Sequence, residues 1–309
     1  MMKNTHWTDY WVKGYVTSLP EDFKSNYDGE LLDFWRNAFS KVPKNARVLD
    51  ICTGNGAVAL LAQEYSDEKN NHWKIDAIDL AEINPKEVLY KNHTKVETSL
   101  INFIGGCSIE DYSVNENDKY DFITSQYGVE YCDLPKAVFN ISKILKDGRK
   151  IGIVSHSPES DMLKNMIREN KDYGLINRLG FFEIIKSFAK GNDSVKSFKL
   201  KIMRLTNALT TRNVNSPLIN DIVTNLYIIG NMPTKQLFLN RKKLKEYSES
   251  LNNAQLRMRD MLQVSKKISD KSGFVDIFQR NSLKLIEDGV INYKNKHHAG
   301  DYYIFEKQE

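Results

Sequence analysis

The sequence predicts an α/β fold: a mostly parallel, doubly wound sheet with a C-terminal antiparallel hairpin and a helical insertion. Two features of the chain predict this fold. Between residues 47 and 155, short apolar runs alternate with helical patterns, which is typical of a parallel sheet covered by helices on both faces. After residue 157 the patterns are helical until residue 273, and two β-rich runs then follow without a helix between them.

The first half of the predicted core repeats a strand, a turn and a helix. Apolar residues around Trp35 recur at steps of three and four, so an amphipathic helix is expected before the sheet. Residues 47–51 (RVLDI) predict the first strand, and residues 57–65, rich in good helix formers, predict the helix after it. A polar loop over residues 66–72 then leads to a second strand over residues 74–80.

The alternation continues through the second half of this core. Residues 102–105 predict a weak third strand, and YDFITS at residues 120–125 predicts a fourth. Residues 134–145, with a proline in the first turn, predict a helix, and residues 150–155 (KIGIVS) predict a fifth strand. The strand ends of such a sheet converge on one crevice, where ligands bind.

The last third of the chain is expected to return to the sheet through one long helix. Residues 244–268 carry an apolar stripe at steps of three and four, which predicts that helix. A strand is then expected at residues 274–278, followed by a loop and by a last strand at residues 301–305. The expected loop contains Gly289, His297, His298 and Gly300.

These patterns predict a division into three parts. A helical cap is expected at residues 1–45, a core at residues 46–157 and 255–309, and a helical insertion or lid at residues 158–254. The stripe presents more apolar surface than one exposed helix leaves in water, so it must pack within the chain or on a second subunit. We therefore expect a substrate lid or an element of a homodimer.

Composition excludes several classes of protein. The 309 residues are 41% hydrophobic and 27% charged, which is close to the average for soluble globular proteins. The longest apolar stretch covers residues 56–62, too short to span a bilayer, and residues 1–11 contain no signal-like apolar segment. Cys52, Cys107 and Cys132 lack CxxC spacing. We therefore expect a cytoplasmic protein. We expect no metal site, either at the cysteines or at the His297–His298 pair.

Charge is unevenly distributed along the chain. Residues 161–272 carry 21 Lys and Arg against 10 Asp and Glu, whereas the whole chain has a net charge of only +4. This basic segment has two interpretations: the solvated faces of surface helices, or a surface that attracts an anionic substrate or nucleic acid.

A glycine-containing turn carries most of the functional information. Residues 48–59 (VLDICTGNGAVA) place Gly54 and Gly56 between the first predicted strand and its helix, where backbone can approach a ligand at the positive end of a helix. The spacing fits the permissive dinucleotide pattern GxGxxA. Asp50, however, would repel a pyrophosphate and attract a cation.

This combination resembles the class I S-adenosylmethionine-dependent methyltransferases, whose first motif has an acidic residue before a glycine-rich turn. The resemblance continues in order through the strand ending at Asp79, the turn at residues 105–110, residues 121–131 and the terminal hairpin. It implies a Rossmann-like fold and S-adenosylmethionine as the cofactor. The family usually has glycine at the position of Cys52, so a slightly more open turn is implied. At the position of Cys107 the family often has an acidic residue.

The resemblance also implies roles for individual residues. Asp79 is expected to accept hydrogen bonds from the ribose hydroxyls, and the alternative is a solvated carboxylate at the end of the strand. Asp50 is expected to order the turn and the ligand's amino group. The backbone of Ser108 and Ile109 is expected beside the adenine. The complete predicted cofactor site comprises Asp50, Cys52, Thr53, Gly54, Asn55, Gly56, Asp79, Leu80, Ser108, Ile109 and Gln126.

Catalytic residues are harder to identify, because methyl transfer from a sulfonium needs a base only where the acceptor must lose a proton. Our candidates are His156, Glu130 and Tyr127, which follow the fourth and fifth predicted strands. A structural histidine is the alternative for His156. The aromatic residues of the segment 6–11 are expected to fold over the cofactor or acceptor, or to pack as a core cap.

The predicted function is S-adenosylmethionine-dependent methyl transfer to a small molecule or peptide. Residues 125–130 contain none of the Pro-Pro-Tyr motifs linked with methylation of base amines, and the chain has no Pro-Cys pair for attack on a pyrimidine. The alternatives are an RNA-modifying methyltransferase that uses the basic insertion, and a noncatalytic cofactor-binding or scaffold protein. An NAD-dependent oxidoreductase is a more distant alternative.

Overall fold

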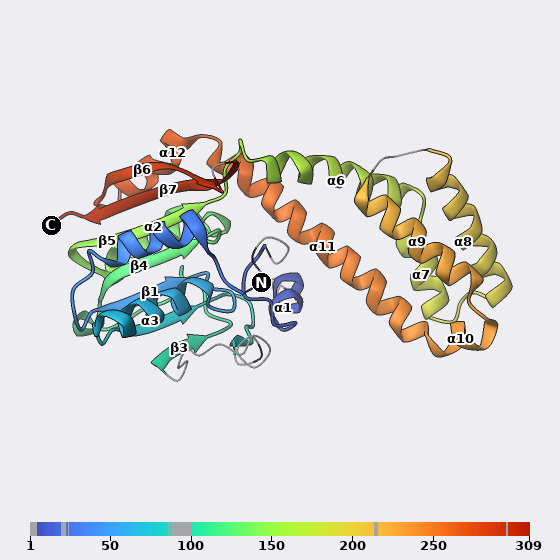
Figure 1. The fold of residues 1–309 in the computed structure, drawn as a ribbon, viewed down its shortest axis with the longest axis horizontal. Coiled ribbons are helices and arrows are strands. Elements are labelled where there is room, and N and C mark those ends of the chain that lie inside the picture. Colours follow the sequence, from blue (N-terminus) through green and yellow to red (C-terminus); the bar gives the residue numbers. More distant parts are fainter. Residues whose placement is uncertain are drawn as a thin grey trace. The chain divides into compact units, whose positions relative to one another are not determined.

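In the part of the chain that the structure describes, one seven-stranded sheet organises the core. The computed structural model describes residues 5–19, 23, 25–85, 87, 100–212, 216–294 and 296–309. The strand order is β3-β2-β1-β4-β5-β7-β6 (Figure 1). The strands are β1 (Arg47–Ile51), β2 (Lys74–Ile78), β3 (Ile101–Ile104), β4 (Tyr120–Gln126), β5 (Leu145–Ser155), β6 (Leu283–Tyr293) and β7 (His297–Lys307). The first five are parallel, and β7 pairs antiparallel with both β5 and β6, so the predicted fold class is confirmed.

Helices cover both faces of the sheet because neighbouring strand residues point to opposite sides. On β1, Val48 belongs to the cluster formed with α2 (Gly29–Phe39) and α3 (Ala57–Lys69). Its neighbour Leu49 belongs to the cluster formed with α5 (Leu134–Ile144) and α12 (Lys271–Gln279). All seven residues of β4 are buried, as expected for a central strand covered on both faces.

The terminal hairpin begins later than the sequence predicts. Residues 274–278 lie in the helix α12, whose Asp270 cap accepts a hydrogen bond from the amide of Gly273 at 2.9 Å. Phe274 and Phe278, one helical turn apart, are both buried against the sheet. The predicted strand is therefore wrong.

Two predicted loops are also wrong. Gly289 lies within β6, and His297, His298 and Gly300 lie within β7, because the two strands pair over their whole length, with shifts in register at two places. The loop predicted at residues 66–72 starts later, since α3 continues to Lys69 and ends at Asn70, whose backbone is left-handed.

The chain divides into two compact units, Met1–Leu163 with Gln263–Glu309, and Lys164–Leu262. The second unit is helical and has its own core, in which Phe181, Phe188 and Phe198 are fully buried. Its helices are α6 (Asp161–Arg178), α7 (Phe181–Ala189), α8 (Val195–Thr210), α9 (Pro217–Asn231), α10 (Thr234–Leu239) and α11 (Arg241–Ile268), of which α6 and α11 extend into the first unit.

The long predicted helix corresponds to α11, and its stripe contributes Leu244 and Met258 to the core of the helical unit. The predicted boundaries near residues 157 and 254, and the lid or dimer role, stay predictions. Among the described helices, none is long and apolar enough to span a bilayer.

Candidate functional site

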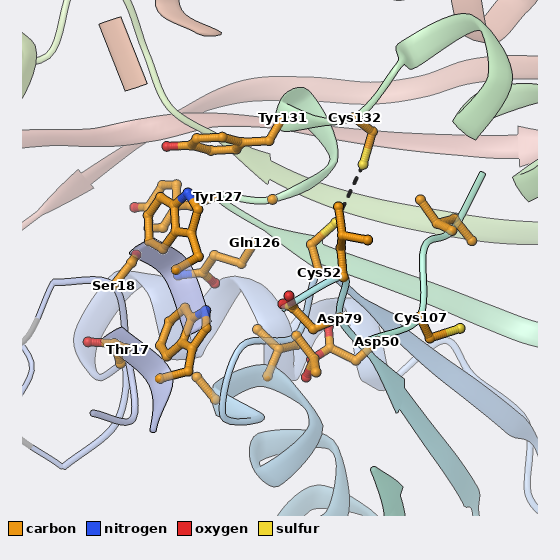
Figure 2. Close-up of a pocket in the computed structure, with 18 of the residues that line it drawn as sticks. Thr17, Ser18, Asp50, Cys52, Asp79, Cys107, Gln126, Tyr127, Tyr131 and Cys132 are labelled. Carbon is orange, nitrogen blue, oxygen red and sulfur yellow. Dashed lines mark hydrogen bonds between the residues drawn. The ribbon is translucent and has the colours of Figure 1, made fainter. Parts of the chain in front are cut away.

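One cavity opens at the carboxyl ends of β1, β2, β4 and β5 (Figure 2). Most of the predicted site residues line it. They are Asp50, Cys52, Thr53, Asp79, Leu80, Ser108, Ile109, Gln126, Tyr127 and His156. Residues far apart in the sequence meet here because all of the parallel strands end at the same edge of the sheet.

The carboxylate of Asp50 orders the turn after β1. It is 2% exposed, and its two oxygens accept hydrogen bonds from the hydroxyls of Thr53 and of Thr124, the latter at 2.8 Å. Burial raises the pKa of Asp50 to about 6, against the lowering effect of these hydrogen bonds. Asp50 therefore ties the turn to β4 while it adds negative charge to the cavity.

Asp79, at the end of β2, anchors the same turn from the other side. One carboxylate oxygen accepts the amide of Gly54 at 2.7 Å, and the other accepts the amide of Ala81 at 2.8 Å. Burial also raises the pKa of Asp79 to about 6. Each oxygen of a carboxylate can accept a second hydrogen bond, and Asp79 remains partly exposed, so it can bind a pair of hydroxyls.

The turn itself needs glycine for steric reasons. Gly54 and Gly56 have φ of +54° and +91°, and a Cβ at Gly54 would lie 2.6 Å from the ring of Trp11. A Cβ at Gly56 would overlap the ring of Phe103. Aromatic rings therefore fill the space beside both glycines in this structure.

The two remaining turn residues, Asn55 and Cys52, have different surroundings. Asn55 is fully buried, and its side chain donates to the carbonyls of Trp11 and Tyr15, so it fixes the segment after α1 (Thr5–Trp11). Cys52 lines the cavity with φ of +54°, a left-handed conformation that favours glycine. Asn55 and the two glycines lie outside the cavity lining, at the base of the turn.

His156 and Glu130 form a buried pair beside the cavity. The Nδ1 atom of His156 lies 2.8 Å from Oε1 of Glu130, and the amide of His156 donates to the same oxygen at 3.0 Å. Glu130 lies in the short helix η3 (Val129–Tyr131) after β4, and both side chains are at most 3% exposed. Among the described residues, Nε2 of His156 has no hydrogen-bond partner.

Tyr127 contributes its ring to the wall of the cavity. Its ring centroid lies 4.7 Å from that of His156, and its hydroxyl donates to the carbonyl of Ala299 at 2.8 Å. Gln126 accepts a hydrogen bond from the indole of Trp35, while its Nε2 atom lacks a partner within the described part of the chain. The hydroxyl of Tyr127 is thus held by β7, whereas the amide of Gln126 lies buried beside Tyr27.

Sequence reasoning missed a second group of lining residues, Thr17, Ser18, Tyr27, Tyr131 and Cys132. Tyr131 ends the segment 121–131 that carries the resemblance, and the other four belong to no motif that the sequence indicates. They reach the cavity because the segment after α1 and the helix η3 fold against the strand ends. Trp7 and Trp11, singled out as an aromatic cluster, also line the cavity and stack on each other with centroids 6.2 Å apart.

Comparison with known proteins gives one family and several weaker similarities. The family described as Methyltransferase domain matches residues 23–189, more than half of the chain. A curated relative, the ubiquinone/menaquinone biosynthesis C-methyltransferase UbiE of Rickettsia felis, is 30% identical over 154 residues. That match covers 45% of this chain and 59% of the relative, so the chain spans under two thirds of that protein's length.

Solved structures show weaker similarity. Phosphoethanolamine N-methyltransferase 2 of Haemonchus contortus is 15% identical with a TM-score of 0.41, over 99% of this chain and 58% of that one. The YcgJ protein of Bacillus subtilis is 16% identical with a TM-score of 0.38, over 90% of this chain and 98% of that one. On the family match over residues 23–189, which include the five parallel strands, this chain belongs to the methyltransferase domain family, whose class I members use S-adenosylmethionine.

Proposed function

We propose that this protein transfers the methyl group of S-adenosylmethionine to an uncharged small-molecule acceptor, and that His156 removes a proton from the acceptor's hydroxyl group. One observation carries the proposal: the imidazole of His156 lines the cofactor cavity with its Nδ1 side engaged by the buried Glu130. The ring therefore has Nε2 left for an acceptor proton.

The cavity residues suit the cofactor. Asp79 has acceptor capacity for the two ribose hydroxyls. Three carboxylates line the cavity, those of Asp50, Asp79 and Glu110, which favours a ligand with a positive charge. When bound, the cofactor supplies an electrophilic methyl group on a cationic sulfur.

The lining also argues for the class of acceptor. Among the described residues that line the cavity there is no Lys or Arg, although such side chains are the usual partners of phosphate and carboxylate groups. Aromatic rings, those of Trp7, Tyr27 and Tyr131 among them, form much of the wall instead. An uncharged, flat hydroxyl compound suits this lining better than a phosphorylated acceptor or an RNA.

His156 and Glu130 then divide the proton transfer between them. His156 would accept the acceptor's hydroxyl proton at Nε2 during methyl transfer. Its Nδ1–H group donates to Glu130, and that buried carboxylate stabilises the imidazolium as it forms. Glu130 is thus a positioning residue, and the ring of Tyr127 packs against the imidazole.

The test uses a matched pair of acceptors, 7-hydroxycoumarin and 7-hydroxycoumarin-3-carboxylic acid, with release of S-adenosylhomocysteine as the readout. We expect turnover with the uncharged phenol and much less with the carboxylate. His156→Asn should lower kcat by about 10²- to 10⁴-fold, the usual contribution of a general base. Its affinity for S-adenosylhomocysteine should stay within about twofold of that of the parent.

Glu130→Gln is the companion variant. It keeps a hydrogen-bond acceptor for Nδ1 but removes the charge, so kcat should fall by less than in His156→Asn, and the pH profile of kcat should shift. Preferred methylation of the carboxylate, or of transfer RNA under the same conditions, would refute the proposed acceptor class. An unchanged kcat in His156→Asn would remove His156 from the reaction.

A further inference from the structure

Two cysteines 80 residues apart in the sequence meet in the wall of the cavity. The Sγ atoms of Cys52 and Cys132 lie 3.6 Å apart, a thiol–thiol contact (Figure 2, dashed line). Cys52 follows β1 directly, and Cys132 follows the helix η3. The third cysteine, Cys107, also lines the cavity and makes no such contact with either thiol.

The backbone on both sides holds this pair in place. Cys52 adopts a left-handed conformation, and a Cβ at Gly128 would overlap the Cβ of Cys52. The absence of a side chain at Gly128 therefore lets the segment after β1 approach the segment after β4. This close approach brings Cys52 within reach of Cys132.

Cys132 can also be reached from outside the cofactor cavity. It lines a second hollow, formed by the start of α5 and by α12, together with Leu134, Lys267 and Phe274. Cys52 does not line that hollow. A small oxidant can therefore reach Cys132 while the cofactor cavity is filled.

We propose that Cys52 and Cys132 are a site of reversible oxidation by hydrogen peroxide, and that their disulfide weakens cofactor binding. The Cys132 sulfur attacks one peroxide oxygen, the O–O bond breaks, and a sulfenic acid and water result. The Cys52 sulfur then attacks the sulfenic sulfur, the S–S bond forms, and the oxygen leaves as a second water. Two thiols lose two electrons and two protons, and one peroxide is reduced to two waters.

The order of attack follows from the surroundings of each thiol. The hydrogen bond with Cys132 and burial together raise the pKa of the Cys52 thiol well above its usual range. Cys52 therefore keeps its proton and is the poorer first nucleophile. Cys132, open to the second hollow, reacts first, and Cys52 resolves the sulfenic acid.

The disulfide acts on the cofactor because Cys52 belongs to the same turn as Gly54. A disulfide needs an S–S distance of about 2.05 Å, so the two sulfurs must approach by about 1.5 Å. A shift of that size at Cys52 displaces Thr53 and Gly54, which hydrogen-bond Asp50 and Asp79 respectively. Both carboxylates then lose the geometry in which they face the ligand.

The experiment follows S-adenosylhomocysteine binding and so does not depend on the acceptor. The full-length protein is treated with hydrogen peroxide, digested and mapped by mass spectrometry, and its affinity is measured by calorimetry before and after dithiothreitol. We expect a peptide linkage between Cys52 and Cys132, at least a tenfold loss of affinity, and recovery on reduction. Each variant is compared with its own untreated form: Cys107→Ser should still form the linkage and lose affinity in peroxide, whereas Cys132→Ser should form no linkage and lose no affinity in peroxide.

Each contrary result overturns the proposal. A linkage that includes Cys107, or no linkage at peroxide concentrations that oxidise free glutathione, would show that the pair is not the oxidised site. A linkage between Cys52 and Cys132 with unchanged affinity would refute the effect on cofactor binding. Loss of affinity in peroxide-treated Cys132→Ser would place the sensitive group elsewhere.

Discussion

Replacing Asp79 by alanine should weaken the binding of S-adenosylhomocysteine by at least one to two orders of magnitude. In the structure each oxygen of Asp79 accepts one backbone amide and has capacity for one ribose hydroxyl. A hydrogen bond to a charged group contributes about 1.5 to 3 kcal/mol, and loss of one such bond corresponds to about a 10- to 150-fold weaker affinity. Asp79→Ala also releases the amide of Gly54, which adds to the loss.

A change in the ligand separates these two effects. Calorimetry is run on the parent and the variant with S-adenosylhomocysteine and with its 2′,3′-dideoxy analogue, which forms a double-mutant cycle between protein and ligand. If Asp79 binds the ribose hydroxyls, the variant weakens S-adenosylhomocysteine more than it weakens the analogue, and the difference measures the ribose contact. If the variant weakens both ligands equally, Asp79 acts only through the turn, and the assigned ribose contact is refuted.

Three further predictions follow from the geometry. Gly54→Ala should reduce cofactor affinity at least tenfold in calorimetry, because the added Cβ meets an aromatic ring. Gly148→Ala, at φ +67° with open space around the residue, is the control, since it introduces backbone strain without such a clash. Equal affinity in both variants would contradict this. Because burial raises the pKa values of both Asp50 and Asp79 to about 6, affinity should be full well above that pH and should fall as the pH drops through it, when the carboxylates gain protons. A flat profile in the parent between about pH 5 and pH 8 would contradict this. Met258→Asp should lower the free energy of unfolding by several kcal/mol in urea titrations, because the Met258 side chain is only 7% exposed. The control Ile228→Asp, at a residue that is 57% exposed, should change this free energy by less than about 0.5 kcal/mol. Similar values for both variants would mean that the apolar stripe of α11 is not packed.

The order of the elements could be predicted from the sequence because buried apolar residues recur at a regular spacing within each element. The five parallel strands were identified as short apolar runs, and the long helix α11 by its stripe, since each pattern reports one element at a time. The run at residues 274–278 was misread because a short apolar segment fits either a strand or a helix. The structure has a helix here, because Asp270 caps it and because Phe274 and Phe278, one turn apart, are both buried.

That most of the predicted cofactor residues lie at one cavity could also be predicted, because they belong to a local motif. Asp50, Gly54 and Asp79 lie where strands end and turns begin, so their order along the chain already implies that they are neighbours in space. Asn55 was the exception. Its buried side chain points to the segment after α1, and no local pattern indicates that direction.

The sequence by itself determined the five parallel strands, the glycine-containing turn and the acidic residues at the ends of β1 and β2. Only the tertiary structure decided that Glu130 engages His156 and that Cys52 touches Cys132. Periodicity reports whether a side chain is buried, but not which distant side chain it meets. Those pairings depend on strand order and on close backbone approaches, such as the one at Gly128, which arise only when the strands assemble into one sheet.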